Sequence, residues 1–391
     1  MTADHWARSN ALAPPRAGRL KDESMPKTIL VLGGYGATGK VLCKRLLEET
    51  DVSLIVAGRR ADKAKLLAEA LNRDCPGERA TSVYADASDR QSLAKAFAGV
   101  SMVLDATAAI PHVRAIAEET LFAGADFLDF HFEQKILPLL QDLEPSIRAA
   151  GRCFITQAGF HPGLPAPFIR YAARFFDSYR FAAIFMAMNQ EIEKAESIYE
   201  LVDMLADYKA DIFENGAWRT AGATDVKTFD FGARFGIRVC YPLQLVEMHA
   251  LPGMLHLEQT GIYVAGFNWL VDNFVIPLGM LLFRIRPGFG RKAIANLMLW
   301  GMNSFGGARR GVTFVFQAEG EKSGQNVRVK IVAEHDDTYA FTAIPVVACV
   351  RQYLDGAIAK PGLWMMGHTV EPDRLIADLT RMGIAIHTEV C

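Results

Sequence analysis

A glycine-rich turn near the start of the chain, residues 33–39, constrains the fold more than any other feature. It follows the apolar run ILVL, which is typical of a strand buried on both faces, and it opens a helical pattern over residues 38–49. Gly34, Gly36 and Gly39 fit the spacing G-x-G-x-x-G, which permits a tight turn, close approach of a pyrophosphate and helix–strand packing. The helix N-terminus then offers free N–H groups to phosphates. We therefore expect a dinucleotide-binding turn made of Gly33, Gly34, Tyr35, Gly36, Ala37, Thr38 and Gly39.

Apolar runs alternate with helical patterns from Thr28 to about residue 162. Such alternation is typical of right-handed βαβ units with a parallel sheet. The sequence predicts an α/β fold, a Rossmann-type doubly wound parallel sheet. Its expected strands are ILVLG, SLIVAG, TSVYAD, SMVLDAT, DFLDF and CFITQAG, with helices over residues 38–49, 61–72, 89–98 and 112–123.

The pattern changes after Gly163. YRFAAIFMAMN reads as a strand, residues 191–209 as a long amphipathic helix, and VTFVFQAEG with VRVKIVAEH as a hairpin. Strands without crossover helices predict a second, α+β domain with a mixed or antiparallel sheet. The expected domains are a disordered extension or mis-assigned start at 1–24, a dinucleotide-binding Rossmann domain at 25–162, a substrate or oligomerisation domain at 163–340, and a helical segment at 341–391 that returns to the first domain.

Composition excludes several classes of protein. At 391 residues the chain is long enough for two cores. The formal net charge of −2 gives no field that would attract nucleic acid. The six cysteines lie far apart, without a C-x-x-C pair or a nearby histidine cluster, so we expect reduced thiols, a cytoplasmic protein and no metal site.

The end of the second expected strand indicates which dinucleotide binds. An acid there would hydrogen-bond the ribose of NAD, whereas this chain has Arg59 and Arg60. Because guanidinium groups pair well with a 2′-phosphate, NADP(H) is expected over NAD(H). Asp86 and Ala87 close the third strand and are expected beside the adenine. The turn after the fourth strand completes the expected cofactor site with Thr107, Ala108 and Ala109.

Ligands of open α/β sheets bind beyond the carboxyl ends of the strands. Three histidines follow strands four, five and six there, namely His112, His131 and His161, and each is a candidate proton carrier because imidazole titrates near neutral pH. Each histidine also has a structural alternative, such as a helix cap or a buried strand end. Asp129 and Glu133 are candidate acids that serve equally well to fix loops.

On these residues, the chain resembles the saccharopine dehydrogenase family of NADP-dependent reductases. The resemblance implies hydride transfer to or from a C=N or C=O bond of a small or partly apolar substrate. The chain departs from the family at His161, where other members often have an acid. The segments that carry it are TILVLGGYGATGKVLCKRLLE with VAGRRADKAKLLAEAL, GADFLDFHFEQ, QAGFHPGLPAPFIRYAA, and YAFTAIPVVACVRQYLDG with the C-terminal helix.

Residues 262–283 form the most apolar stretch, and basic residues follow it. We expect two short helices that meet at Pro277. Three settings for these helices remain open. They are the lining of a hydrophobic pocket, a homodimer contact and, over residues 262–302, a peripheral membrane patch. Since a carboxylate facing hydrocarbon is costly, Asn268 and Asp272 are expected to point into protein, with Trp269 and Phe274 on the apolar side.

Two other functions remain open at this point. One is a non-catalytic NADP-binding protein attached to a membrane or to lipid bodies. The other is a lipid-linked enoyl reductase, which shares the fold but reduces a C=C bond. Turnover of imines or enoyl compounds with NADPH would separate the enzymes from the binding protein.

The glycine turn gives a first prediction. Gly36→Val is expected to abolish NADPH binding in a protein that still folds, because the side chain occupies the place of the pyrophosphate. Isothermal titration of NADPH, with circular dichroism for the fold, measures both quantities. A folded variant with the affinity of the wild type contradicts the assignment of this turn.

Overall fold

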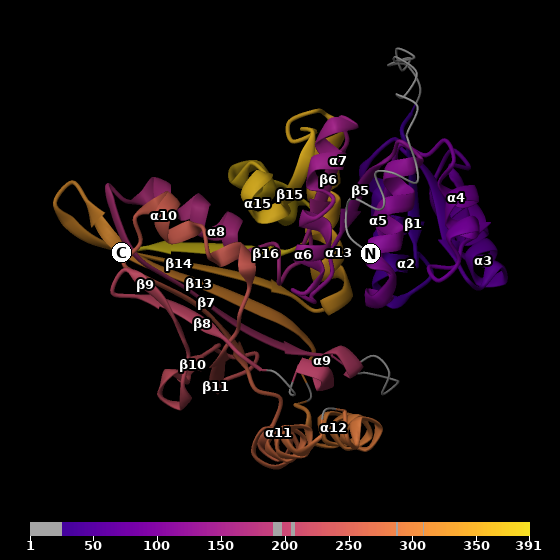
Figure 1. The fold of residues 1–391 in the computed structure, drawn as a ribbon. Helices are drawn as coiled ribbons and strands as arrows, with labels where there is room; N and C mark the ends of the chain where they lie inside the picture. Colours follow the sequence, from indigo (N-terminus) through magenta and orange to yellow (C-terminus); the bar gives the residue numbers. More distant parts are fainter. Residues whose placement is uncertain (1–25, 191–197, 205–207, 287, 308) are drawn as a thin grey trace.

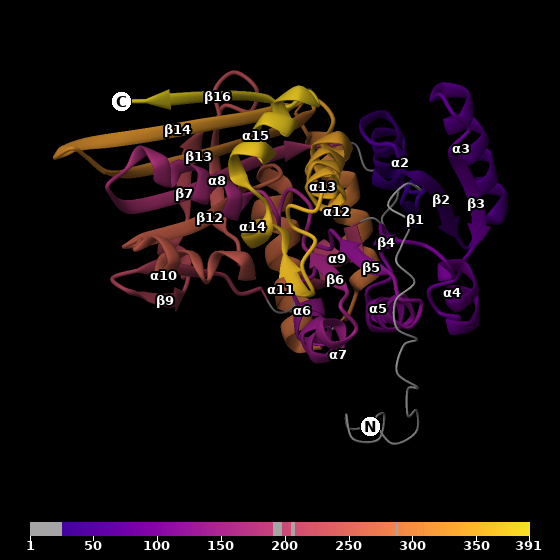
Figure 2. The same cartoon turned by 90° about the horizontal axis from the view of Figure 1, so that it is seen from above.

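Two β-sheets form the body of the protein, as Figures 1 and 2 show. The computed structural model describes residues 26–190, 198–204, 208–286, 288–307 and 309–391. The expectation for residues 1–24 and part of the helix expected at 191–209 lie outside the described residues. Of that helix, the structure describes α9 (Tyr199–Met204).

The first sheet has seven strands in the order β15-β6-β5-β4-β1-β2-β3, and every pairing is parallel. It confirms the predicted Rossmann-type fold and all six expected strands. The seventh, β15, comes from the tail of the chain and was not predicted. The strands are β1 (Thr28–Leu32), β2 (Ser53–Gly58), β3 (Ala80–Tyr84), β4 (Met102–Asp105), β5 (Asp126–Asp129), β6 (Cys153–Thr156) and β15 (Gly362–Met365).

Helices cover both faces of this sheet because its strands are apolar on both faces. Ile29 and Val31 of β1 belong to one core cluster, with α2 and α3, while Leu30 and Leu32 belong to another, with α4 to α7. This division of alternate residues is the expected result for a buried parallel strand. The helices are α2 (Ala37–Glu49), α3 (Ala61–Asp74), α4 (Arg90–Phe97), α5 (Val113–Phe122), α6 (Ile136–Gln141) and α7 (Glu144–Ala149).

The second sheet is mixed, as predicted, with the order β10-β11-β12-β7-β13-β14-β16 and a branch of β8 and β9. β12 pairs with β7 in parallel, while β13 and β14 form the expected antiparallel hairpin. The strands are β7 (Ser178–Asn189), β8 (Asp211–Glu214), β9 (Ala217–Thr220), β10 (Lys227–Asp230), β11 (Ile237–Pro242), β12 (Gln259–Ala265), β13 (Gly311–Lys322), β14 (Gln325–His335) and β16 (Ala385–Val390).

The helix α13 (Thr338–Leu354) lies between the two sheets in both views. It packs along α2 and also contacts β13 and β14. Arg351 donates to the carbonyl oxygen of Glu49 at the end of α2, at 2.7 Å. The tail then adds β15 to the first sheet and β16 to the second, so it is not only helical. The remaining helices are α8 (Pro165–Ala172), α10 (Leu251–Leu255), α11 (Ile276–Ile285), α12 (Arg291–Phe305), α14 (Met366–Thr369) and α15 (Pro372–Arg381).

The apolar stretch 262–283 does not form two short helices, so that prediction is wrong. Its first residues complete β12, which is buried against β7. A π-helical turn, η6 (Val271–Val275), then runs directly into α11. Pro277 is the second residue of α11, and the helix continues through it from the π-helical turn without a break. Among the helices that the structure describes, none combines the length and the apolar character needed to cross a bilayer.

The orientation of the polar side chains in this stretch is confirmed. Asp272 accepts a hydrogen bond from the Phe267 N–H at 2.8 Å, and Asn268 donates to the Gly301 carbonyl oxygen at 3.1 Å. Trp269 and Phe274 are exposed instead. The polar groups therefore face the protein, and the aromatic groups face outward.

A buried carboxylate fixes the segment that leads from β6 into the second sheet. Glu247 is inaccessible to solvent and accepts from the N–H groups of Gly163 at 2.6 Å and Ala166 at 3.3 Å, next to the first turn of α8. Gly367 leaves room for it, since a Cβ there would lie 2.3 Å from Glu247 Oε2. Burial nevertheless raises the pKa of Glu247 to about 7, although both N–H groups lower it.

This shift predicts a pH dependence of stability. The folded protein holds the Glu247 proton more tightly than the unfolded chain, whose pKa is 4.5. The contribution of Glu247 to stability is therefore full below pH 4.5 and is lost as the pH rises to about 7. Glu247→Gln keeps one acceptor and removes this loss, so its stability relative to the wild type is expected to rise by up to about 3 kcal/mol over this range. Urea unfolding at several pH values measures it.

Glu389→Gln, on the exposed face of β16, is the matched control and should follow the wild type at every pH. If the free energies of unfolding of the wild type and Glu247→Gln differ by a constant amount from pH 4.5 to pH 7, Glu247 does not retain its proton.

Candidate functional site

The glycine turn brings the carboxyl ends of β1 and β4 together. Gly33 has a left-handed backbone with φ +82°, and its N–H donates to the Ala57 carbonyl oxygen at 2.8 Å. A Cβ on Gly33 would lie 2.8 Å from the carbonyl oxygen of Ala106. A Cβ on Gly39 would lie 2.5 Å from the carbonyl oxygen of Gly33. Both glycines are therefore required by the close approach of backbone to backbone.

Gly36 differs from these two glycines. Its φ of −66° and ψ of 172° suit any residue, and a Cβ there would meet only the Gly33 carbonyl oxygen, at 3.1 Å. It caps α2 without a side chain, which leaves the helix N-terminus open to the cleft. A side chain at Gly36 would require the Gly33 carbonyl oxygen to move by only a few tenths of an ångström, so the main reason for glycine lies in the ligand that approaches this backbone.

A cavity of about 460 Å³ lies above this turn, at the point where the strand order reverses between β1 and β4. Ten of the predicted cofactor residues line it, and Gly34, Ala37, Thr38 and Gly39 lie outside its lining. Gly34 packs beneath the turn, since a Cβ there would lie 3.1 Å from Cys43 Sγ. The lining residues from the prediction are Gly33, Tyr35, Gly36, Arg59, Arg60, Asp86, Ala87, Thr107, Ala108 and Ala109.

Tyr35 joins the turn to the basic pair at the end of β2. Its hydroxyl accepts from the Arg60 N–H at 3.1 Å, and the Arg60 guanidinium lies 5.2 Å from its ring centroid. Gly58 makes this possible, because a Cβ there would lie 2.5 Å from the Tyr35 ring. Arg59 and Arg60 are both exposed at the mouth of the cavity. The mouth therefore presents two cations where a 2′-phosphate is expected.

Asp86 lines the same cavity. Its Oδ1 accepts from the Ser88 N–H at 2.9 Å and from the Ser88 hydroxyl at 2.8 Å. These two hydrogen bonds, with Arg59 nearby, hold the pKa of Asp86 below its usual range. A charged Asp86 keeps the loop after β3 in one shape beside the cavity.

A buried carboxylate–imidazole pair adjoins Thr107 in the loop that lines the cavity. Asp105, the last residue of β4, is inaccessible, and its Oδ2 lies 3.0 Å from Nε2 of His131, which follows β5. Its Oδ1 accepts from the N–H of Thr107 at 3.0 Å and from the Thr107 hydroxyl at 2.7 Å. Asp105 thus holds both a candidate proton carrier and the loop that lines the cavity. It was missed from the sequence, although an acid that closes a buried apolar strand is itself a signal.

Further buried polar atoms surround this pair at the ends of β5 and β6. Asp129 accepts from the N–H groups of His131 and Gln157, both at 3.2 Å, while its second oxygen has no partner among the described residues. Burial raises the pKa of Asp129, against the charge of His131. Gln157 has φ 58°, and both atoms of its buried amide are also without a partner in the described chain. Buried polar atoms are normally satisfied, so these groups are candidates to bind a ligand.

The other predicted catalytic residues are not brought to this pair. His161 lies against Phe160 in a tilted arrangement with 3.7 Å between ring centroids, and burial lowers its pKa to about 3, so it is uncharged near neutral pH. Glu133 accepts from the Lys135 N–H and so fixes a turn. His112 ends η1 (Ile110–His112) and lines the cavity itself. His112 and His131 are therefore the two histidines beside the cavity that suit proton transfer.

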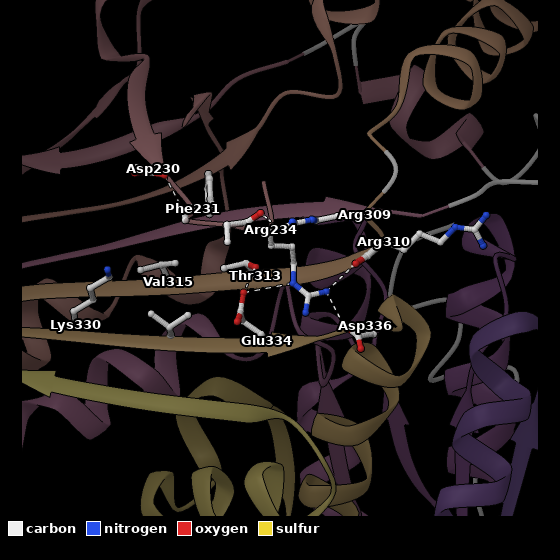
Figure 3. Close-up of a pocket in the computed structure, with 13 residues that line it drawn as sticks. Asp230, Phe231, Arg234, Arg309, Arg310, Thr313, Val315, Lys330, Glu334 and Asp336 are labelled. Atoms are coloured by element: carbon white, nitrogen blue, oxygen red, sulfur yellow. Dashed lines mark hydrogen bonds and ion pairs between the residues drawn. The ribbon is translucent and has the colours of Figure 1, made fainter. Parts of the chain in front are cut away.

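A second cavity, of about 880 Å³, opens on the second sheet (Figure 3). Thr313 and Val315 of β13 line it, whereas their neighbours Val312 and Phe314 face the core that contains α13. It therefore lies on the face of the sheet opposite α13. Arg234 is held there by Glu334 at 3.5 Å and Asp336 at 2.7 Å, so its charge is balanced. This cavity is separate from the cofactor site.

Comparison with known proteins agrees with this geometry. Residues 29–218 match the family model of the saccharopine dehydrogenase NADP binding domain. This stretch, just under half of the chain, is saccharopine dehydrogenase-like. Saccharopine dehydrogenase (L-Glu forming) from Saccharomyces cerevisiae is similar in structure, with a TM-score of 0.67 and 15% identity over 93% of this chain and 100% of that chain. No curated protein matches the chain.

A second solved structure is the DAP dehydrogenase of C. glutamicum in complex with DAP. It has a TM-score of 0.48 and 16% identity, and the match covers 91% of this chain and 98% of that chain. The family assignment makes the chain an NADP(H)-binding oxidoreductase. The residues present fit this cofactor, since the turn leaves a helix N-terminus open and Arg59 and Arg60 lie together at the cavity mouth.

The basic pair at the mouth predicts cofactor preference. Arg59→Ala with Arg60→Ala is expected to weaken NADPH binding by roughly 100-fold and to leave NADH binding nearly unchanged, because only NADPH carries the 2′-phosphate. Isothermal titration with each dinucleotide measures the ratio. Lys63→Ala with Lys65→Ala, exposed on the helix that follows, is the matched control. An unchanged NADPH to NADH ratio in the double Arg variant would refute the assignment.

Proposed function

We propose that this protein is an NADP(H)-dependent reductase of the saccharopine dehydrogenase type, which transfers a hydride to or from the C=N bond of an imine, or a related C=O bond. The observation that carries the proposal is the buried pair of Asp105 and His131 beside the cofactor cavity. Such a pair supplies a held proton next to a hydride donor, which is what reduction of a polar double bond requires.

NADPH, when bound, supplies the hydride. The chain supplies the cofactor site, the wall that orients the acceptor and the proton. The open N-terminus of α2 binds the pyrophosphate, and Arg59 and Arg60 bind the 2′-phosphate. The turn with Thr107, Ala108 and Ala109 forms the wall that orients the acceptor, and Asp105 fixes that wall through two hydrogen bonds.

His131 is the residue that we assign to the proton. The Asp105 carboxylate accepts from one ring nitrogen or stabilises the imidazolium, so the ring keeps one orientation. Asp129, whose pKa is raised by burial, and the amide of Gln157 offer further hydrogen bonds to a polar acceptor. His112 at the cavity wall is the alternative proton carrier.

The substrate is tested with a panel of compounds at fixed NADPH. The panel contains pairs of an amino acid and a 2-oxo acid or aldehyde, which form imines in solution, together with ketones and enoyl thioesters. NADPH oxidation that needs both members of an amine–carbonyl pair supports an imine. Turnover of enoyl thioesters alone supports the enoyl reductase, and no turnover of any member supports a binding protein.

The pair itself gives the next prediction. His131→Gln is expected to lower kcat by 100-fold or more on the best compound of the panel, because general acid catalysis contributes about 10²–10⁴-fold. The Kd for NADPH should change by less than about threefold, since His131 is not among the residues that line the cofactor cavity. His387→Gln, exposed on β16, is the control. If His131→Gln keeps the kcat of the wild type and His112→Gln loses activity, the proton carrier is His112 instead.

A further inference from the structure

The helices α11 and α12 project beyond both sheets, below the rest of the molecule in Figure 1. They are joined to the body by a small core of their own, in which Val275 and Phe283 pack against Val202 of α9 and Met298 of α12. Only one side of α11 is used in this core. The opposite side is left without cover in the described structure.

That outer side is a continuous apolar stripe. Phe274, Leu278, Leu281 and Ile285 are spaced at i, i+4, i+7 and i+11, which places them on one face of a helix. All four are exposed, with Ile285 the most accessible at 73%. Scattered exposed apolar residues are ordinary, but an unbroken stripe of this kind marks a binding surface.

Aromatic residues border the stripe at the other end of the helix pair. Trp269 is 60% exposed and contacts Phe274 at 6.0 Å and Phe305 at 5.8 Å between ring centroids, and Phe305 in turn contacts Trp300. The cluster therefore joins the ends of both helices into one apolar surface, here called the apolar tip. Tryptophan is enriched where a protein meets the interface of a membrane and water.

The charged residues that belong to the two helices of the apolar tip all have one sign. From Asn273 to Ala318 the sequence contains no Asp or Glu, and its charged residues are Arg284, Arg286, Arg291, Lys292, Arg309 and Arg310. Arg284, Arg286 and Lys292 are exposed. Arg291 pairs with Asp203 on α9. Cations beside an apolar surface complement a layer of lipid phosphates above hydrocarbon.

We infer that the apolar tip docks this protein on the surface of an anionic phospholipid bilayer. Leu278, Leu281 and Ile285 enter the boundary between headgroups and acyl chains, and Trp269 lies at the level of the headgroups. Arg284 and Arg286 contact the lipid phosphates. No carboxylate has to enter, because Asp272 already accepts the Phe267 N–H on the protein side.

Charge favours a bilayer over a second copy of the chain. In a two-fold contact through the apolar tip, each tip would face its own copy. The rim arginines would then face arginines, with no acid from Asn273 to Ala318 to pair with them. Like charges at an interface cost affinity. A surface of lipid phosphates instead gives Arg284 and Arg286 a partner of opposite charge.

The test is co-sedimentation of the full chain with phospholipid vesicles. The wild type is expected to bind vesicles of phosphatidylcholine with about one third phosphatidylglycerol, and to bind pure phosphatidylcholine vesicles weakly. Binding should fall as NaCl rises to about 0.5 M, because salt screens the arginines. Tryptophan emission should shift to the blue on binding, as Trp269 leaves water.

Two double variants separate the contributions. Leu281→Asp with Ile285→Asp should reduce vesicle binding by 100-fold or more, while Arg284→Ala with Arg286→Ala should reduce it roughly 30-fold on anionic vesicles only. Leu66→Asp, at a residue 64% exposed on α3, is the matched control and should bind like the wild type. Unchanged NADPH affinity shows that each variant is folded, and it makes the result independent of the proposed reaction.

Three outcomes would overturn the inference. The first is a wild type that does not bind anionic vesicles. The second is a Leu281→Asp, Ile285→Asp variant that binds as well as the wild type. The third is a wild-type dimer, seen by sedimentation velocity, that becomes a monomer in this variant while neither protein binds vesicles, which would assign the apolar tip to a second copy.

Discussion

Burial of α13 between the two sheets is the constraint on which the rest of the structure depends. Nearly every residue of this helix is inaccessible, so it belongs to the core of the first sheet and the core of the second at once. Its packing along α2 fixes the helix whose N-terminus forms the phosphate turn. The same helix therefore ties the cofactor turn to the second sheet.

The first sheet and the cofactor cavity were largely predictable because local signals define them. Each of its first six strands is an apolar run followed by a helix, and the glycine spacing marks the turn where the chain approaches a ligand. β15 escaped prediction because GLWM is short and only partly buried. Its strand character comes from pairing with β6, a partner distant in the sequence.

The catalytic side and the apolar stretch were harder to predict, for different reasons. The role of His161 depends on its enclosure by aromatic rings, and the role of Asp105 depends on a contact with His131 across two strands. Neither contact leaves a sequence pattern. Residues 262–283 were misassigned because only a short turn separates a buried strand from an apolar helix, and hydrophobicity alone does not distinguish the two.

The tail has a consequence for how the chain folds during synthesis. β15 forms one edge of the first sheet, and β16 forms one edge of the second. Until the ribosome has released residues 362–365, β6 therefore lacks its outer neighbour, and β14 waits even longer for β16. Until those residues are made, the pairing edges of β6 and β14 stay uncovered, and uncovered strand edges favour aggregation. Neither sheet can therefore assemble its full set of strands before the segment that carries β15 and β16 has been synthesised.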